Sequence, residues 1–232
     1  MKSIIRTLLA VTSMTAMSAM AVTYNDNTGD IDPGIANGGG TLDIVSMEVA
    51  NTLSDITFTM TVNGNISTTD WGNFMIGIAT PGAPGTTTGN GWARPIELDS
   101  ANGHMDYWVG SWVNGGGGSQ LWDYTGSGTD GGTGSNWAGP AGLAGYSIAA
   151  GAQSTLTYTL TLASLGIGVG DTIYFDAYST GGGGTDSAVD ALSNPNVSIT
   201  AWDQQYNSGT SSGVSSYTVV PEPASVALFG LG

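Results

Sequence analysis

The sequence predicts an all-β protein, an antiparallel β-sandwich of the jelly-roll or immunoglobulin-like type with about nine or ten strands. Apolar residues alternate with threonine over strand-length runs, which is the pattern of a half-buried strand. The 38 glycines in 232 residues separate these runs by tight turns and long glycine-rich loops. No stretch after the N-terminal leader has a convincing helical period, and no fixed-period repeat points to a propeller or solenoid.

Residues 1–21 have the three parts of a secretory signal peptide. Lys2 and Arg6 give a basic start, Leu8 to Val11 form a short apolar middle, and Ala19-Met20-Ala21 is a small-residue cleavage site. The middle is too short and too rich in Ser and Thr to span a bilayer stably. We therefore expect cleavage after Ala21, a single folded domain over residues 22–219 and a separate tail over residues 220–232.

The segment from Val22 to Gly40 is dense in oxygen ligands. Asp26, Asp30 and Asp32 surround Gly29, and oxygen donors at short, irregular spacing suit the flexible coordination of calcium. Their spacing differs from the EF-hand pattern, and Asp and Asn also build ordinary Asx-turns. The segment therefore has two interpretations, a calcium site and a set of turns.

Two segments show the strand pattern most clearly. Ile56, Phe58, Met60 and Val62 alternate with threonines, and the same alternation recurs from Thr155 to Leu162. The run 74–78 is apolar almost throughout and predicts a further strand, followed by a loop over 80–90. In chain order, we expect strands over 45–49, 56–62, 74–78, 107–113, 121–124, 146–149, 155–162, 173–178, 197–202 and 217–219.

Residues 91–124 hold four of the seven tryptophans and the only histidine, His104. On a strand over 107–113, Trp108 and Trp112 project from one face, roughly 13 Å apart, with Gly110 leaving a gap between them. Such a pair matches the footprint of two or three sugar rings, and Trp122 would lie nearby. The alternative is that both indoles fill the core of the sandwich.

Other polar residues of this block could hydrogen-bond a ligand beside the indoles. Arg94, Asp106 and Asp123 are the candidates. Arg94 is the only Lys or Arg outside the leader, so the alternative for it is a structural salt bridge.

Composition excludes several chemistries. There is no cysteine, and no lysine follows the leader, which excludes thiol catalysis, disulfides and Schiff-base formation. With Arg94 against 18 Asp and Glu, the mature part has a formal charge of −17, which disfavours nucleic acid and anionic lipid and favours metal ions or neutral polymers. A Ser-His-Asp arrangement would have to use the single histidine, His104, and no carboxylate pair stands out for glycoside hydrolysis. We therefore expect a protein that is not an enzyme.

The C-terminus resembles the PEP-CTERM sorting signal of Gram-negative bacteria. Pro221, Glu222 and Pro223 match its Pro-Glu-Pro, and an apolar run follows. The resemblance implies processing by an exosortase-type enzyme at the cell envelope and transient membrane contact through a C-terminal segment. Only nine residues follow Pro223 and no basic end is present, so we expect the signal to be truncated in this sequence.

The body more loosely resembles the extracellular β-sandwiches of the DOMON and family 9 carbohydrate-binding-module type. The resemblance rests on the loop 26–32, the strand 71–78, the segment 103–107 and Asp176. It implies a module that clamps sugars between tryptophans, here Trp108, Trp112 or Trp122, near a structural calcium.

We therefore expect a protein secreted to the cell envelope surface of a Gram-negative bacterium. Its expected role is that of a non-catalytic surface or extracellular-matrix protein that binds polysaccharide through tryptophans, with calcium as the candidate cofactor. The alternatives are a purely structural biofilm or matrix protein and, less favoured, a glycoside-acting enzyme.

Overall fold

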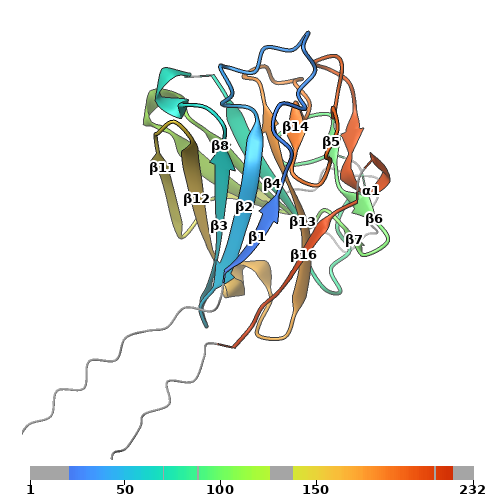
Figure 1. Cartoon of the computed structure of the whole chain (residues 1–232). Coiled ribbons are helices and arrows are strands. Elements are labelled where there is room, and N and C mark those ends of the chain that lie inside the picture. The colour runs from blue at the N-terminus through green and yellow to red at the C-terminus, as the bar shows by residue number, and fades with distance from the viewer. Residues whose placement is uncertain (1–20, 70, 88, 126–137, 212, 222–232) are drawn as a thin grey trace, which may run out of the picture.

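Two antiparallel sheets facing one another form the core of the protein in the computed structural model, which describes residues 21–69, 71–87, 89–125, 138–211 and 213–221 (Figure 1). The first sheet has the order β1-β2-β3-β12-β11. The second has the order β10-β9-β8-β4-β13-β14, with β16 also paired to β13. The prediction of an all-β sandwich is therefore confirmed.

The first sheet contains the strands with the clearest alternation. Thr57, Thr59 and Thr61 face Thr159, Thr157 and Thr155 across the central strand pair, while the intervening apolar side chains, such as Phe58 and Tyr158, are buried. The strands are β1 (Val22–Asn25), β2 (Ile44–Asn51), β3 (Asp55–Val62), β11 (Gly145–Ala149) and β12 (Ser154–Thr161).

The central strands of the second sheet, around the nearly continuous apolar run at 74–78, are buried on both faces. Phe175 meets Phe58 of the first sheet with ring centroids 5.4 Å apart, and the Ser111 and Tyr158 hydroxyls are hydrogen-bonded at 2.9 Å. The strands are β4 (Asn73–Ala79), β8 (Tyr107–Trp112), β9 (Gly118–Asp123), β10 (Ala138–Ala141), β13 (Thr172–Thr180), β14 (Asp190–Ala191) and β16 (Ser215–Thr218).

A layer of connecting segments covers the outer face of the second sheet. Leu98 and Met105 from this layer pack against Gly77, and Tyr206 meets Tyr178 with ring centroids 6.1 Å apart. Figure 1 shows the layer beside β4 and β13. Its elements are β5 (Ile96–Glu97), β6 (Asp99–Ser100), β7 (Gly103–His104), β15 (Tyr206–Asn207) and the α-helix α1 (Ser208–Ser211).

The structure differs from the sequence prediction in the number and position of the strands. The described ranges contain 16 strands rather than about nine or ten. The additional ones are mostly two-residue pairings without a periodic pattern. The prediction of a strand over 197–202 is wrong, because this segment forms bends and turns. Gln204 N donates to Ala201 O, and Thr200 N donates to Gln204 Oε1.

The helices are short. The 3₁₀ turns are η1 (Ile66–Thr68), η2 (Asn114–Gly116) and η4 (Leu162–Leu165). None of the helices in the described residues is long and apolar enough to cross a membrane.

The two ends of the described body lie at the same end of the sandwich (Figure 1). Asn51, the last residue of β2, donates through Nδ2 to Val220 O at 2.9 Å and accepts from Val220 N at 3.1 Å. Since Val22 pairs with Val49 on the same strand, the residues next to the predicted leader and next to the predicted sorting signal are close together.

Candidate functional site

Three carboxylates from distant parts of the chain converge at one point. Asp26 follows β1, Asp30 lies in the next loop, and Asp190 begins β14, yet one oxygen from each lies within 4.8 Å of the others. A calcium ion with its usual bond lengths holds ligand oxygens about 3–5 Å apart. We call these three residues the carboxylate cluster, and its spacing fits a hard cation.

The hydrogen bonds of the carboxylate cluster leave several oxygens without a donor. Asp190 accepts from Ile44 N at 2.6 Å and from Ala191 N at 2.8 Å, and Asp26 Oδ1 accepts from Asn27 N at 2.8 Å. Asp26 Oδ2 and both carboxylate oxygens of Asp30 are shielded from solvent and have no hydrogen-bond partner. Because desolvated anionic oxygens are costly when unpaired, these three oxygens are the natural ligands of a cation.

Electrostatics at the carboxylate cluster oppose the ionisation of all three groups. Burial, followed by the charges of Asp190 and Asp30, raises the pKa of Asp26 to about 9. Burial raises the pKa of Asp30 to about 6, and burial and the charge of Asp30 raise the pKa of Asp190 well above its usual range. A bound divalent cation would reverse this balance, since it favours the charged carboxylates.

The structure changes the membership of the predicted calcium site. Asp26 and Asp30 meet as expected, but the third carboxylate comes from Asp190, and Asp32 lies outside the group. Asp32 Oδ1 instead accepts from Gly34 N at 2.7 Å, which is Asx-turn chemistry. Sequence spacing missed Asp190 because it is 160 positions from Asp30, although an aspartate between Val189 and Ala191 in an apolar stretch is a signal of a buried polar role.

A pocket of about 390 Å³ adjoins the carboxylate cluster. Asp26 belongs both to the cluster and to the pocket wall, which also includes Asn25 and Ser193. The pocket therefore adjoins the cluster at Asp26, while Asp30 and Asp190 do not line it.

Trp108 lies in the core rather than on a binding platform. It has no exposed surface, and its ring stacks on Tyr178 with centroids 6.1 Å apart. Of the two interpretations of Trp108, the structure supports the core one, and its ring cannot belong to a surface site.

The gap that Gly110 leaves between Trp108 and Trp112 is filled by the protein itself. The indole of Trp92 lies so close to Gly110 that a Cβ there would collide with it, and its ring centroid is 6.4 Å from those of both Trp108 and Trp112. This packing corrects the expectation of an open sugar-binding slot over Gly110. Trp92 itself was given no role in the sequence analysis.

Trp112 and Trp122 retain part of their surface. Both are half-buried, and Gln120 Oε1 accepts from Trp92 Nε1 at 2.9 Å and from Trp122 Nε1 at 3.3 Å. Trp112 packs over Gly118, and Trp122 packs over Gly91. Of the three tryptophans predicted to bind sugar, only these two have exposed surface.

Arg94 is a buried residue whose side chain hydrogen-bonds other parts of the protein. It is buried with 6% of its surface exposed, and its Nη1 donates to Gly183 O at 2.7 Å, Asp186 O at 3.0 Å and Thr180 Oγ1 at 3.2 Å. Its guanidinium carbon also lies 5.5 Å from the centre of the Trp92 ring. Arg94 therefore ties the loop at 183–186 to the sheet through neutral oxygens rather than through a carboxylate ion pair.

Asp106 and Asp123 bind local threonines. Asp106 Oδ2 accepts from Thr80 N at 2.5 Å and from Thr80 Oγ1 at 3.0 Å, and Asp123 Oδ1 accepts from Thr125 N at 2.7 Å and from Thr125 Oγ1 at 2.6 Å. Asp106 is buried, and burial raises its pKa to about 6. Each carboxylate therefore has a partner within the fold, and neither lines the pocket beside the carboxylate cluster.

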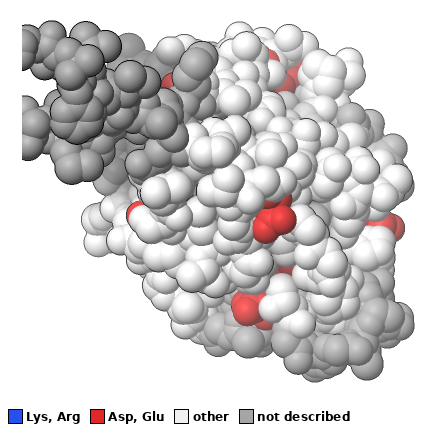
Figure 2. Space-filling model, turned by 90° about the horizontal axis from the view of Figure 1, so that it is seen from below, with Lys and Arg blue, Asp and Glu red and all other residues white. Residues whose placement is uncertain are grey.

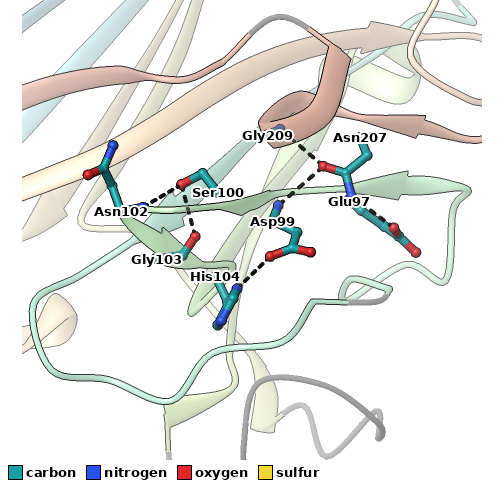
Figure 3. Close-up of polar contacts among 8 residues, drawn as sticks. All are labelled: Glu97, Asp99, Ser100, Asn102, Gly103, His104, Asn207 and Gly209. Atoms are coloured by element: carbon teal, nitrogen blue, oxygen red, sulfur yellow. Dashed lines mark hydrogen bonds and ion pairs between the residues drawn. The ribbon is translucent and has the colours of Figure 1, made fainter.

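His104 belongs to the outer layer. Its Nδ1 lies 2.9 Å from Asp99 Oδ1 across the β6–β7 pair (Figure 3). In the same view Asn207 joins this pair to the helix α1, because its Oδ1 accepts from Asp99 N at 3.4 Å and from Gly209 N at 3.0 Å. These contacts hold the layer together.

Over the described residues, the Lys, Arg, Asp and Glu side chains that reach the surface are few and all acidic. Figure 2 shows the molecule from below. On this face, acidic side chains are separated by uncharged surface. Arg94 is the only Lys or Arg among the described residues, and it is buried.

The predicted sorting signal lies mostly outside the described residues. Pro221 is exposed at the end of the body, and Glu222 and Pro223 are outside the described ranges. Comparison of the chain with models of known protein families, with curated proteins and with solved structures gives no match.

Proposed function

We propose that the chain is the body of a secreted, non-catalytic surface or extracellular-matrix protein that binds calcium through Asp26, Asp30 and Asp190. The convergence of these carboxylates within 4.8 Å carries the proposal. Their donor atoms are all oxygen, which suits calcium better than softer metals. A cation here would join the loop after β1 to the start of β14, and so connect the two sheets at this end.

The envelope role is supported by the sequence at both ends. The basic and apolar leader is typical of secreted proteins, and the Pro-Glu-Pro of residues 221–223 resembles a sorting signal that an exosortase-type enzyme processes. The ends of the body emerge together, so both segments would be accessible at one end of the domain. Membrane contact would be transient and confined to the C-terminal segment.

A non-catalytic role is favoured because the polar groups near the tryptophans are occupied. Asp106 and Asp123 each bind a threonine, and Arg94 binds backbone oxygens. A purely structural matrix protein, held together with its neighbours by calcium, uses the same carboxylate cluster and is the alternative role.

Polysaccharide binding is the second candidate activity. The half-buried indoles of Trp112 and Trp122 favour it, because indole faces stack on the apolar faces of sugars. The charge of −17 on the mature chain favours a neutral polysaccharide over an acidic one.

Calcium is expected to stabilise the folded protein against unfolding. At a free concentration about 100 times the dissociation constant, the gain is about 2.7 kcal/mol, which corresponds to a rise in Tm of about 5–10 °C for a domain of this size. Asp30→Asn should abolish the rise, since both oxygens of Asp30 are free to ligate and the substitution removes no hydrogen bond within the protein. Thermal unfolding in EGTA and in calcium, together with calorimetric titration, measures both effects.

Asp32→Asn is the matched control, because it neutralises a carboxylate two residues away that lies outside the cluster. It should keep the full calcium response. Loss of the response in Asp32→Asn and its retention in Asp30→Asn and Asp190→Asn would contradict the proposed ligand set.

A further inference from the structure

Three half-buried tryptophans surround one glutamine on the outer face of β8 and β9. Gln120 is paired with Gly110 across the two strands. Trp112 lies two residues beyond Gly110 on β8 and therefore shares its face, and Trp122 lies two residues beyond Gln120 on β9. The indole of Trp92 comes from the loop before β5 and lies over Gly110. The strand register and this contact therefore place the three indoles and the glutamine on one face of the sheet.

Two of the indoles orient the side-chain amide of Gln120. Its Oε1 accepts from Trp92 Nε1 at 2.9 Å and from Trp122 Nε1 at 3.3 Å. An indole N–H can only donate, so the amide oxygen must face both rings. Nε2 of Gln120 donates to none of the described residues, and the residue is only half-buried. Two N–H donors are therefore held in a fixed direction beside the indoles and are free for a ligand.

The turn that carries Trp92 is braced and strained. Nδ2 of the buried Asn90 donates to Arg94 O at 2.8 Å and to Ile96 O at 2.9 Å. Its Oδ1 accepts from Trp92 N at 3.0 Å and from Arg94 N at 3.2 Å. Ala93 has a φ of 53°, the only positive φ among the described residues other than glycine. Such strain persists only where the surrounding structure holds it, and it is concentrated at binding sites. The turn therefore fixes Trp92 before any ligand binds.

Trp112 extends the aromatic surface beyond Trp92. The two ring centroids are 6.4 Å apart, with 41° between the ring planes. The Trp112 ring rests on the backbone of β9 at Gly118, where a Cβ would collide with it. Trp112 keeps part of its surface and is not packed against the hydrophobic core. Its ring is therefore available for contact without being required for the core.

The charges around this face favour a neutral ligand. The free polar group is an uncharged amide. Arg94 lies 5.5 Å from the centre of the Trp92 ring, but it is buried and its Nη1 donates to the backbone oxygens of Gly183 and Asp186. An acidic polymer would therefore meet no free cation here, and the charge of −17 on the mature chain repels it.

We propose that Gln120, with Trp92 and Trp112 beside it, binds a neutral polysaccharide on the outer face of β8 and β9. This inference rests on the polysaccharide-binding part of the proposed function and adds Gln120 and Trp92 to its contacts. The indoles supply surfaces for the apolar faces of sugar rings. Nε2 of Gln120 donates to a hydroxyl or ring oxygen at the edge of a sugar.

Gln120→Glu tests the site, because a carboxylate still accepts from both indole N–H groups but has no N–H to donate. Native gels containing dextran, laminarin or hydroxyethylcellulose should retard the wild-type whole chain. For a polysaccharide that binds, Gln120→Glu should raise the dissociation constant about 2- to 10-fold, the effect of one lost hydrogen bond. Trp112→Ala should raise it at least about tenfold and leave the Tm within about 2 °C, because Trp112 is outside the core.

Gln204→Glu is the matched control. Gln204 also accepts two hydrogen bonds through Oε1, from Thr200 N at 2.8 Å and from Thr200 Oγ1 at 3.1 Å, but it lies in the turns at 200–204. The variant has the same added charge as Gln120→Glu, so it corrects for the change in mobility. It should be retarded like the wild type.

The outcomes separate this site from polysaccharide binding in general. Wild-type binding that Gln120→Glu leaves unchanged would overturn the site and keep polysaccharide binding, whichever result Trp112→Ala gives. Should Gln120→Glu melt below the wild type, Trp112→Ala decides, and unchanged binding in that variant would overturn the site. A wild-type protein that none of the three polysaccharides retards would overturn both.

Discussion

Replacing Trp108 with alanine is expected to lower the free energy of unfolding by about 3–5 kcal/mol, the usual cost of removing a fully buried large aromatic side chain. Trp108 has no exposed surface and contacts both Tyr178 and Trp92, so its truncation leaves a cavity beside these rings. Domains of this size have a total stability of about 5–15 kcal/mol. Urea unfolding followed by circular dichroism measures the loss.

Two matched variants separate burial from the other properties of this indole. Trp108→Phe keeps most of the ring and removes an indole N–H that has no hydrogen-bond partner, so it should cost clearly less than alanine. Trp122→Ala removes a half-buried indole from the neighbouring strand and should also cost less. A Trp108→Ala protein as stable as the wild type would show that the ring does not contribute to the core.

The sequence was sufficient to predict the two central strand pairs, because burial on one face imposes a period of two. The threonines of β3 and β12 occupy the outward positions in register, as the alternation required. The apolar run at 74–78 also indicated a strand, which the structure shows to be buried on both faces. These features depend on local pattern, which a single sequence contains.

The outer layer could not be predicted, because its elements are held by side chains and not by a periodic pattern. The β15–β5 pair is two residues long and parallel, and Asn207 joins it to the rest of the layer through single hydrogen bonds. At 197–202 the apolar residues suggested a strand, yet only Ile199 is deeply buried and Val197 is 40% exposed. Local turns satisfy the backbone of that segment instead of a neighbouring strand.

The candidate site was predicted in part for the same reason. Asp26 and Asp30 are close in sequence, so their loop was recognisable, whereas Asp190 reaches them only because β14 pairs with β13 at the edge of the second sheet. The predicted tryptophan platform was wrong for a different reason. Strand geometry correctly placed Trp108 and Trp112 on one face, but no local pattern shows that Trp92 packs over that face.

Asp106 should make the protein less stable as the pH rises from about 4 to about 6. Burial, its largest influence, raises the pKa of Asp106 to about 6 in the folded state, whereas an unfolded aspartate titrates near pH 3.9. Between these values the folded protein binds more protons than the unfolded chain, so the free energy of unfolding falls with increasing pH. The contribution is fully present below about pH 4, and a shift of about two units corresponds to about 3 kcal/mol lost above pH 6.

Asp106→Asn isolates this contribution, because asparagine still offers an oxygen to the Thr80 donors but does not titrate. Burial also raises the pKa of Asp30 and Asp176 to about 6, but these groups are present in both proteins and cancel in the comparison. Urea unfolding in EGTA at about pH 4 and about pH 7 should show a loss about 3 kcal/mol larger in the wild type than in the variant. Equal losses in the two proteins would mean that Asp106 is ionised in the folded state well below pH 6, so that the buried Oδ1 without a donor would carry a charge that Thr80 alone stabilises.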